Sequence, residues 1–259
     1  MRLPLTLLML LPVAALCAAQ PVEVHHVLEL QSPEDKVVAL TLDACGGEVD
    51  ADLLAFLVRH RIPATVFATR KWLVRHPDAV ALLNARSDLF DVEDHGERHV
   101  PAIIGAGRSV RGIPGNADPE QLRREVLGGA KAVEAATGRL PRWYRGAGGE
   151  YDPLALEIIE SLGLGVAGFS LNADDGATLT RQQIVRRLQR AKNGDIIIAH
   201  VNKPGSDTAE GLAAGLKALQ ERGFRFVTLR DARLRVLKDV APTRQRRAAG
   251  VEPPRPFSI

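Results

Sequence analysis

Three histidines and one aspartate in this sequence are of the residue types that enzymes use to hydrolyse amide bonds. His95 and His99 are four residues apart, so both imidazoles can face one side of a helical turn and ligate one cation. Asp43 directly follows an apolar run, and His200 closes a run of three isoleucines and an alanine. A bound cation can lower the pKa of water and polarise a carbonyl, while a carboxylate and an imidazole can move the protons. These residue types predict metal-dependent hydrolysis.

Each of these residues also has an ordinary structural interpretation. Asp43 could lie in a turn at the start of a helix, because aspartate favours turns and helix N-termini. His200 could be a core histidine that the backbone satisfies. A pair of histidines four residues apart is by itself a weak signal for a metal site. The prediction therefore depends on a fold that brings these residues together.

Short β-rich runs alternate with amphipathic helical stretches along most of the chain. Strands are expected at residues 37–42, 64–68, 89–92, 142–144, 166–171, 196–199 and 226–228. Helices are expected at residues 50–60, 72–84, 119–137, 153–162, 182–191 and 209–222. Such alternation predicts an α/β fold with parallel strands and crossover helices. Over roughly 220 residues without an internal linker, a single (β/α) barrel is expected, and a doubly wound sheet is the alternative.

The carboxyl ends of parallel strands meet at one face of such a fold, and active sites form there. Asp43 follows the first expected strand, and the two histidines at 95 and 99 follow the third. Arg145 opens a glycine-rich loop after the fourth strand, and His200 ends the sixth. We therefore expect these side chains to gather at one face.

Two helices carry local boundary signals. Pro119 stands in the first turn of the expected helix 119–137, and Gly138 follows its last residue. Thr180 and Gln183 have the spacing of a capping box. These signals fix the starts of two crossover helices.

Five short motifs follow one another along the chain. They are residues 37–43, residues 95–99, residues 145–148, residues 172–174 and residues 196–200. Their residues, order and spacing resemble those of the polysaccharide deacetylase family (carbohydrate esterase family 4), and the resemblance covers about residues 37–230. It implies a distorted, often incomplete (β/α) barrel. It also implies a hydrolase that uses a divalent metal to remove acetyl groups from N-acetylhexosamines in glycans.

The resemblance implies a role for each motif residue. Asp43 would take a proton from water, and Arg145 would pair with Asp43 and hold it ionised. His200 would give a proton to the departing sugar nitrogen, because its ordinary pKa is close to neutral. Asp174 would orient and tune His200. Backbone N–H groups of residues 146–149 would help to bind the developing oxyanion.

The metal set departs from the family pattern. The family has two adjacent aspartates in its first motif, the second of which ligates the metal, and Ala44 stands at that second position. Cys45 follows and could supply a thiolate, although its place in the motif is awkward for a ligand. Carboxylates near the motif or water could complete the metal shell instead: Asp43, Glu48 and Asp50. We expect zinc, held by His95, His99 and Asp43.

The substrate groove also differs from the family pattern. Gly148 stands where the third motif usually has an aromatic residue, and the fourth motif has no tryptophan. Three hypotheses remain open for the function. They are an N-deacetylase of an N-acetylated glycan, a non-catalytic relative that binds glycan, and a hydrolase of another amide or ester bond.

Composition limits the partners. The 34 basic and 31 acidic residues leave a net charge of only +3, and aromatic residues make up 4%, so nucleic acid is not expected as a partner. Two cysteines exclude a disulfide framework. The sequence does not indicate the oligomeric state.

The two ends of the chain differ from the expected domain at residues 20–240. Residues 1–19 have the layout of a signal peptide, with one basic residue, an apolar stretch and small residues before Gln20. Lipid attachment at Cys17 is the alternative. We expect export to the bacterial periplasm or the extracellular space, without a stable membrane span after cleavage. Residues 241–259 lack apolar periodicity, and we expect a flexible tail.

Overall fold

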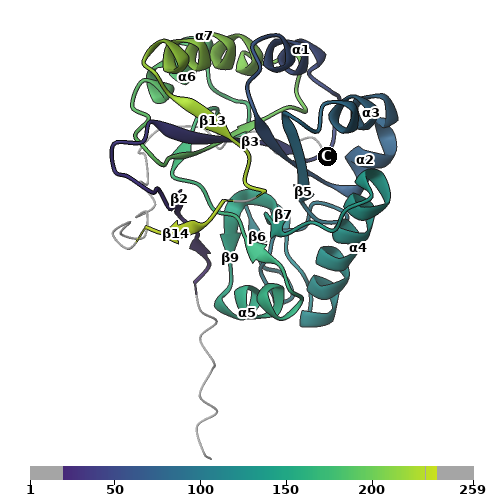
Figure 1. The fold of residues 1–259 in the computed structure, drawn as a ribbon. Coiled ribbons are helices and arrows are strands. Elements are labelled where there is room, and N and C mark those ends of the chain that lie inside the picture. Colours follow the sequence, from purple (N-terminus) through teal and green to yellow (C-terminus); the bar gives the residue numbers. More distant parts are fainter. Residues whose placement is uncertain (1–19, 231, 238–259) are drawn as a thin grey trace, which may run out of the picture.

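The computed structural model describes residues 20–230 and 232–237 (Figure 1). The predicted signal peptide at residues 1–19 and the predicted tail at residues 241–259 lie outside the described residues. The described helices and strands form a single α/β fold in which helices cover the outer side of a parallel sheet (Figure 1).

The main sheet has eight strands, and every pairing within it is parallel. Seven strands run in the order β10-β8-β5-β4-β3-β12-β11, and β13 also pairs with β3. Their bounds are β3 Val37–Ala44, β4 Ala64–Ala68, β5 Phe90–Asp94, β8 Trp143–Tyr144, β10 Gly165–Val166, β11 Leu171–Asn172, β12 Ile196–His200 and β13 Arg225–Val227. The sheet curls into an incomplete (β/α) barrel, which confirms the expected fold class.

The barrel stays open between β10 and β11. These two strands form opposite edges of the sheet, and within the described ranges they do not pair with each other. The expected strand at residues 166–171 is therefore wrong. The backbone there crosses the opening: Ala167 N donates to Tyr144 O at 2.9 Å on one side, and Ser170 N donates to Ile196 O at 3.0 Å on the other.

All eight residues of β3 are buried, as is usual for a strand covered on both faces. Val37 and Ala39 belong to the apolar cluster inside the barrel. Leu40, Leu42 and Ala44 belong to the cluster that packs between the sheet and the helices. Because successive side chains of a strand point to opposite faces, odd-numbered residues of β3 face the interior.

Seven α-helices surround the sheet in the described part of the chain (Figure 1). They are α1 Ala51–Arg59, α2 Arg70–Arg75, α3 Pro77–Ala85, α4 Pro119–Thr137, α5 Pro153–Ser161, α6 Arg181–Leu188 and α7 Thr208–Glu221. The expected single helix at residues 72–84 is wrong, because Pro77 starts a second helix and His76 leaves the helical conformation. Helix α4 has the expected bounds, and the predicted capping box of α6 is present.

Three short antiparallel pairs complete the fold. They are β1 (Val22–Glu23) with β9 (Glu150–Tyr151), β2 (His26–Leu28) with β14 (Leu234–Val236), and β6 (Ser109–Val110) with β7 (Ile113–Pro114). A one-turn 3-10 helix, η1 (Ala147–Gly149), precedes β9. Among the described helices, none has both the length and the apolar character that a membrane span requires.

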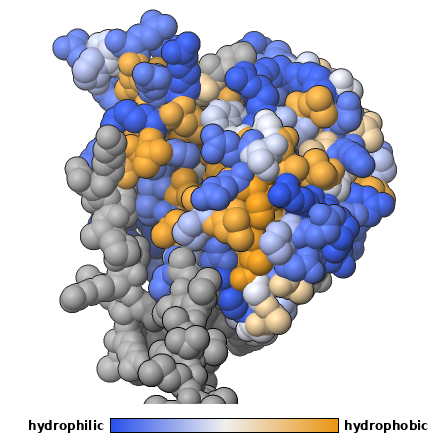
Figure 2. All heavy atoms as spheres, turned by 90° about the horizontal axis from the view of Figure 1, so that it is seen from below, coloured by the Kyte–Doolittle hydropathy of each residue, from blue (hydrophilic) through white to orange (hydrophobic). Residues whose placement is uncertain are grey.

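The outer surface mixes apolar and hydrophilic side chains. Seen from below the view of Figure 1, apolar residues gather near the middle of the face and hydrophilic residues surround them (Figure 2). The most exposed large apolar side chains lie on separate elements, such as Val74 on α2 and Leu154 on α5. Single exposed apolar residues of this kind are ordinary on globular proteins.

Candidate active site

The carboxyl ends of β8, β5, β3 and β12 bring the expected residues to one face of the sheet. Asp43 lies in β3 directly opposite His200 of β12 in the strand register. Asp94 at the end of β5 lies opposite Tyr144 of β8, so His95 and Arg145 leave the sheet side by side. A pocket at this face is lined by Asp43, His200 and further residues, among them Cys45, His99, Gly148, Asn172 and Lys203.

Arg145 holds Asp43 in place. Its Nη1 donates to Asp43 Oδ1 at 2.9 Å and to Thr41 Oγ1 at 2.8 Å, and its Nε donates to Ala167 O at 3.0 Å. The guanidinium is buried and lies over the Phe67 ring, 4.1 Å from the ring centroid. The structure therefore has the Arg145–Asp43 pair that the resemblance implies. One carboxylate oxygen is fixed by this pair, and Oδ2 faces His95 Nε2 at 3.7 Å.

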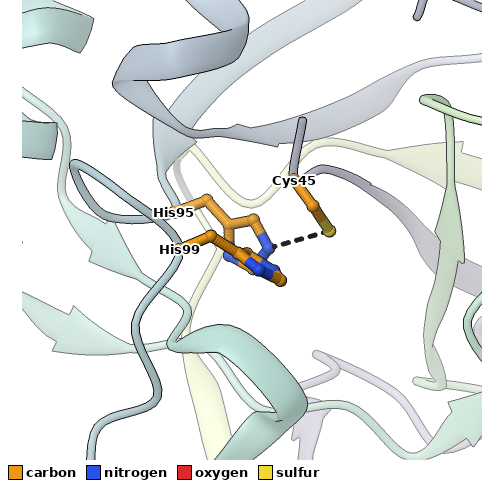
Figure 3. A group of neighbouring side chains, drawn as sticks. All are labelled: Cys45, His95 and His99. Carbon is orange, nitrogen blue, oxygen red and sulfur yellow. Dashed lines mark hydrogen bonds between the residues drawn. The ribbon is translucent and has the colours of Figure 1, made fainter. Parts of the chain in front are cut away.

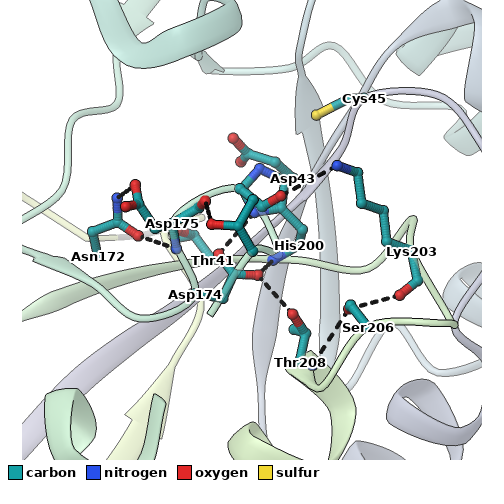
Figure 4. A network of polar contacts seen from close by, with 12 residues as sticks. Thr41, Asp43, Cys45, Asn172, Asp174, Asp175, His200, Lys203, Ser206 and Thr208 are labelled. Carbon is teal, nitrogen blue, oxygen red and sulfur yellow. Dashed lines mark hydrogen bonds and ion pairs between the residues drawn. The ribbon is translucent and has the colours of Figure 1, made fainter. Parts of the chain in front are cut away.

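Asp174 fixes His200 through two hydrogen bonds (Figure 4). His200 Nδ1 donates to Asp174 Oδ1 at 2.9 Å, and the backbone N of His200 donates to Oδ2 at 2.9 Å. Thr208 Oγ1 donates to the same Oδ2 at 3.1 Å. Burial by itself lowers the pKa of His200, but the charge and hydrogen bonds of Asp174 outweigh burial and raise that pKa well above its ordinary value. His200 is therefore suited to carry a proton at neutral pH, and its ring also has a hydrogen bond with Cys45, which raises the pKa of His200 further.

The residues that could hold a metal are Cys45, His95 and His99 (Figure 3). One ligand atom from each lies within 4.8 Å of the others, and Cys45 Sγ is 3.4 Å from His95 Nε2. His95 Nδ1 donates to Arg145 O at 2.6 Å, so the tautomer leaves Nε2 directed at the group. A thiolate and two imidazoles are typical zinc ligands, so the donor set fits a divalent metal.

In the described residues, none of the carboxylates expected to replace the missing aspartate joins the Cys45, His95, His99 group. Glu48 is exposed and pairs with Arg75, at 2.6 Å from Oε1 to Nη2. Asp50 caps α1, where Oδ1 accepts from Leu53 N at 3.0 Å. Asp43 lies beside His95 but is not a member of the three-residue group found among the described residues. Sequence reasoning judged Cys45 awkwardly placed, and the structure brings it to both histidines.

Burial and charge act in opposite directions on the two ends of the Cys45–His95 contact. Burial alone raises the pKa of the Cys45 thiol, but the nearby imidazoles outweigh burial and lower it well below its ordinary value. Burial alone lowers the pKa of His95, but Asp43 and Cys45 outweigh burial and raise it to about 9. Both shifts favour the thiolate and the imidazolium, whereas ligation of a cation requires the thiolate and the neutral imidazole.

The loop that carries the histidines is not the helical turn expected from their spacing. Gly96 has φ 88° and His99 has φ 68°, both in the left-handed region. A side chain at Gly96 would collide with Glu125 Oε1. Buried Glu125 of α4 accepts backbone hydrogen bonds from Arg98 N at 2.9 Å and Val100 N at 3.0 Å. The conformation of this loop therefore depends on a carboxylate at least 25 residues further along the chain. The spacing of the two histidines gives no information about that contact.

The glycine-rich loop after β8 supplies fewer free amides than expected. Gly146 N donates to Tyr151 Oη at 2.9 Å, and Gly149 N donates to Gly146 O at 3.1 Å. The amides of Ala147 and Gly148 are therefore the candidates for binding an oxyanion. Gly148 has φ 77°, and a Cβ there would lie 2.7 Å from Val110 Cγ1. The β6–β7 hairpin thus occupies the space next to the position where the family usually has an aromatic residue.

Sequence reasoning discounted Cys45 as a ligand, and it missed Thr41, Thr208 and Glu125. The strand period offered a signal for the first two, because Thr41, Asp43 and Cys45 share one parity. Thr208 and Glu125 reach the site from α7 and α4, far along the chain. No local pattern marks those two contacts.

The chain belongs to the polysaccharide deacetylase family, because residues 31–167 match that family. It is a divergent member of carbohydrate esterase family 4. It is 25% identical to a chitooligosaccharide deacetylase of Bradyrhizobium over 204 residues, which cover 78% of this chain and 81% of the relative. It is also 25% identical to a peptidoglycan-N-acetylglucosamine deacetylase of Bacillus cereus, over 76% of this chain and 88% of the relative.

Solved structures share the fold. A peptidoglycan N-acetylglucosamine deacetylase structure matches with a TM-score of 0.65 and 20% identity, over 79% of this chain and 89% of the other. A family 4 pseudoenzyme from Bacillus anthracis matches with a TM-score of 0.61 and 22% identity, over 76% of this chain and 65% of the other. At these identities the match concerns the fold.

Glu125 offers a test of the loop geometry. Glu125→Gln replaces one accepting oxygen with an NH₂ group that faces backbone donors, so the His99 loop should shift. We expect metal affinity to fall by about 10- to 100-fold, the range seen when residues that orient ligands are changed. Competition with a chromogenic chelator measures the affinity. Glu120→Gln on the exposed side of α4 is the matched control, and equal affinities in the two variants would contradict the role of Glu125.

Proposed function

We propose that this protein is an exported, metal-dependent N-deacetylase of a glycan. The observation that carries the proposal is one pocket edge on which the Asp43–Arg145 pair, the His200–Asp174 pair and the Cys45, His95, His99 group lie together. A groove that only bound sugar would need neither a held carboxylate nor a protonated imidazole opposite it. The arrangement supplies a base, an acid and a cation site, which amide hydrolysis requires.

Asp43 is the proposed base. When bound, the divalent metal supplies Lewis acidity, which lowers the pKa of water and polarises the acetyl carbonyl. Asp43 then accepts the proton of the attacking water at Oδ2, because Arg145 holds Oδ1. The buried Arg145 guanidinium keeps the carboxylate oriented through its hydrogen bond to Oδ1.

His200 is the proposed acid. Asp174 holds the ring by Nδ1, so Nε2 gives its proton to the sugar nitrogen as the C–N bond breaks. The amides of Ala147 and Gly148 stabilise the negative charge on the former carbonyl oxygen. The products are acetate and a free amine on the sugar.

The substrate class comes from the relatives. The two curated relatives are named for deacetylation of chitooligosaccharides and of N-acetylglucosamine in peptidoglycan. We propose an N-acetylhexosamine-containing glycan as the substrate and zinc as the metal. We also propose residues 20–240 as the catalytic domain and the bacterial periplasm or extracellular space as the location, on the layout of residues 1–19.

Acetate release tests the reaction. We expect the zinc-loaded protein to release acetate from N-acetylated chitooligosaccharides or peptidoglycan fragments and not from O-acetylated sugars. Release from O-acetylated sugars alone would support the esterase hypothesis. Cell fractionation with an antibody against the protein tests export, because an exported protein separates from cytoplasmic markers.

A non-catalytic glycan-binding relative is the second candidate. It is favoured by Ala44, which replaces the aspartate that ligates the metal in the family pattern. Binding of the same oligosaccharides without acetate release, in protein shown to contain metal, would support this candidate.

Metal binding should depend on His99. We expect His99→Gly to leave substoichiometric metal after dialysis, because catalytic zinc usually has three protein ligands. Glycine adopts the φ of 68° without strain, so the melting temperature should stay close to that of the wild type. Elemental analysis and circular dichroism measure the two quantities, with His60→Ala at the C-cap of α1 as control. Unchanged metal content in His99→Gly would contradict the site.

A further inference from the structure

The strand period of β3 decides which residue of the first motif reaches the histidines. Thr41 and Asp43 face the barrel interior, where Arg145 contacts both. Ala44 has no exposed surface and packs among the residues between sheet and helices. Cys45 is the first residue after β3 and has the same parity as Asp43, and its side chain lines the pocket and approaches both histidines. In this chain position 44 faces away from the site and position 45 faces it.

The distances suit one metal ion. Zinc bonds of about 2.3 Å to sulfur and about 2.0–2.1 Å to nitrogen give a ligand separation of about 3.5 Å at a tetrahedral angle. Cys45 Sγ and His95 Nε2 are 3.4 Å apart, and the His99 donor atom lies within 4.8 Å of both (Figure 3). A small rotation of the half-buried side chains of Cys45 and His99 would bring all three donor atoms to tetrahedral spacing.

Asp43 is otherwise engaged. Arg145 binds its Oδ1, and the pair is buried. Ligation by Asp43 would also consume the only carboxylate that the proposed mechanism has for taking a proton. A thiolate at position 45 leaves that carboxylate as a base.

We propose that the Cys45 thiolate is the third protein ligand, in a Cys-His-His metal centre with His95 and His99. The inference rests on the metal-dependent function proposed above. Thiolate is a soft ligand that favours zinc or cobalt over magnesium, calcium or manganese. The centre therefore selects thiophilic metals.

Cobalt titration tests the ligand directly. The full chain with Cys17→Ser keeps Cys45 as its single thiol, because the sequence has two cysteines. We expect Co²⁺ to give a thiolate-to-cobalt charge-transfer band in the near ultraviolet at one equivalent. We also expect bound Zn²⁺ to block reaction of the thiol with Ellman's reagent, and removal of Zn²⁺ to restore it.

Three variants in the Cys17→Ser background test whether metal binding depends on the position of residue 45 or on its thiolate. Cys45→Ser should lose the charge-transfer band and bind metal weakly. Cys45→Asp should lose the band, keep one equivalent of metal and shift its preference from zinc toward manganese. Ala44→Asp together with Cys45→Ser should not recover metal binding, because residue 44 faces the helices.

The outcomes distinguish this inference from the proposed function. Acetate release by protein that contains metal but shows no charge-transfer band would overturn the ligand and leave the function standing. The band without any acetate release would leave the ligand standing and contradict the function. A thiol equally reactive with and without zinc, or an acetyl thioester trapped on Cys45, would also overturn the ligand.

Discussion

Asp43→Asn should lower kcat on the order of 10²- to 10⁴-fold while metal affinity stays close to that of the wild type. Asparagine can still accept the hydrogen bond from Arg145, but it cannot take a proton from water. Acetate release and metal titration on the same preparation measure the two effects. A parallel loss of metal affinity would show instead that Asp43 is a ligand, and full activity would refute both roles.

The same substitution should also lower stability, which needs a control. Arg145 is buried, and leaving a buried charge without its partner costs about 3–5 kcal/mol. Thr41→Val is the matched control, because it removes the other acceptor of Arg145 Nη1 and leaves the carboxylate in place. We expect Thr41→Val to lower the melting temperature with little change in kcat.

His200→Ala should lower kcat by a similar order, on the order of 10²- to 10⁴-fold, and should remove the alkaline limb of the pH–rate profile. The limb exists because the acid must be protonated, so activity falls as the pH rises through the raised pKa of His200. Asp174→Asn removes the charge that raises this pKa, so the limb should move to lower pH. Rate measured against pH for each variant checks both shifts.

Asp175→Asn is the control for the pH shift. Asp175 follows Asp174 in the sequence, is partly exposed, and bonds Arg111 and Asn172 and not His200. We expect the alkaline limb of the pH–rate profile of Asp175→Asn to coincide with that of the wild type. A limb that stays unshifted in both His200→Ala and Asp174→Asn would remove His200 from the mechanism.

The fold could be predicted from the sequence where local signals decide it. Helix α4 starts at Pro119 behind its Asp118 cap and ends at Thr137, where Gly138 follows in the left-handed conformation, and each signal acts on the helix end beside it. The strand predicted at residues 166–171 was wrong because contacts distant in sequence decide the conformation there. Their apolar character reflects burial across the barrel opening, and the choice between pairing and crossing depends on Tyr144 and Ile196, which lie far away in sequence.

The residues that gather at the candidate site could be predicted from the sequence, but the third candidate metal ligand, Cys45, could not. Asp43, His95, His99, Arg145 and His200 stand at strand ends, where a parallel sheet gathers them. The family pattern predicts the third metal ligand at position 44, because its first motif has an aspartate there. Strand parity would have favoured Cys45, but parity becomes reliable only once the end of β3 at Ala44 is known.

The pairing of β2 with β14 has a consequence for how the molecule assembles. Leu28 pairs with Leu234 and His26 with Val236, so segments from the two ends of the described chain complete each other. His26 Nδ1 also accepts from Gly168 N at 3.1 Å, in the segment that crosses the barrel opening. Contacts between residues so distant in sequence form slowly, because a long loop must close before they bring any gain. Nascent chains that lack the last strand should therefore stay protease-sensitive around the opening, and final closure of the molecule should await the emergence of residues 234–236.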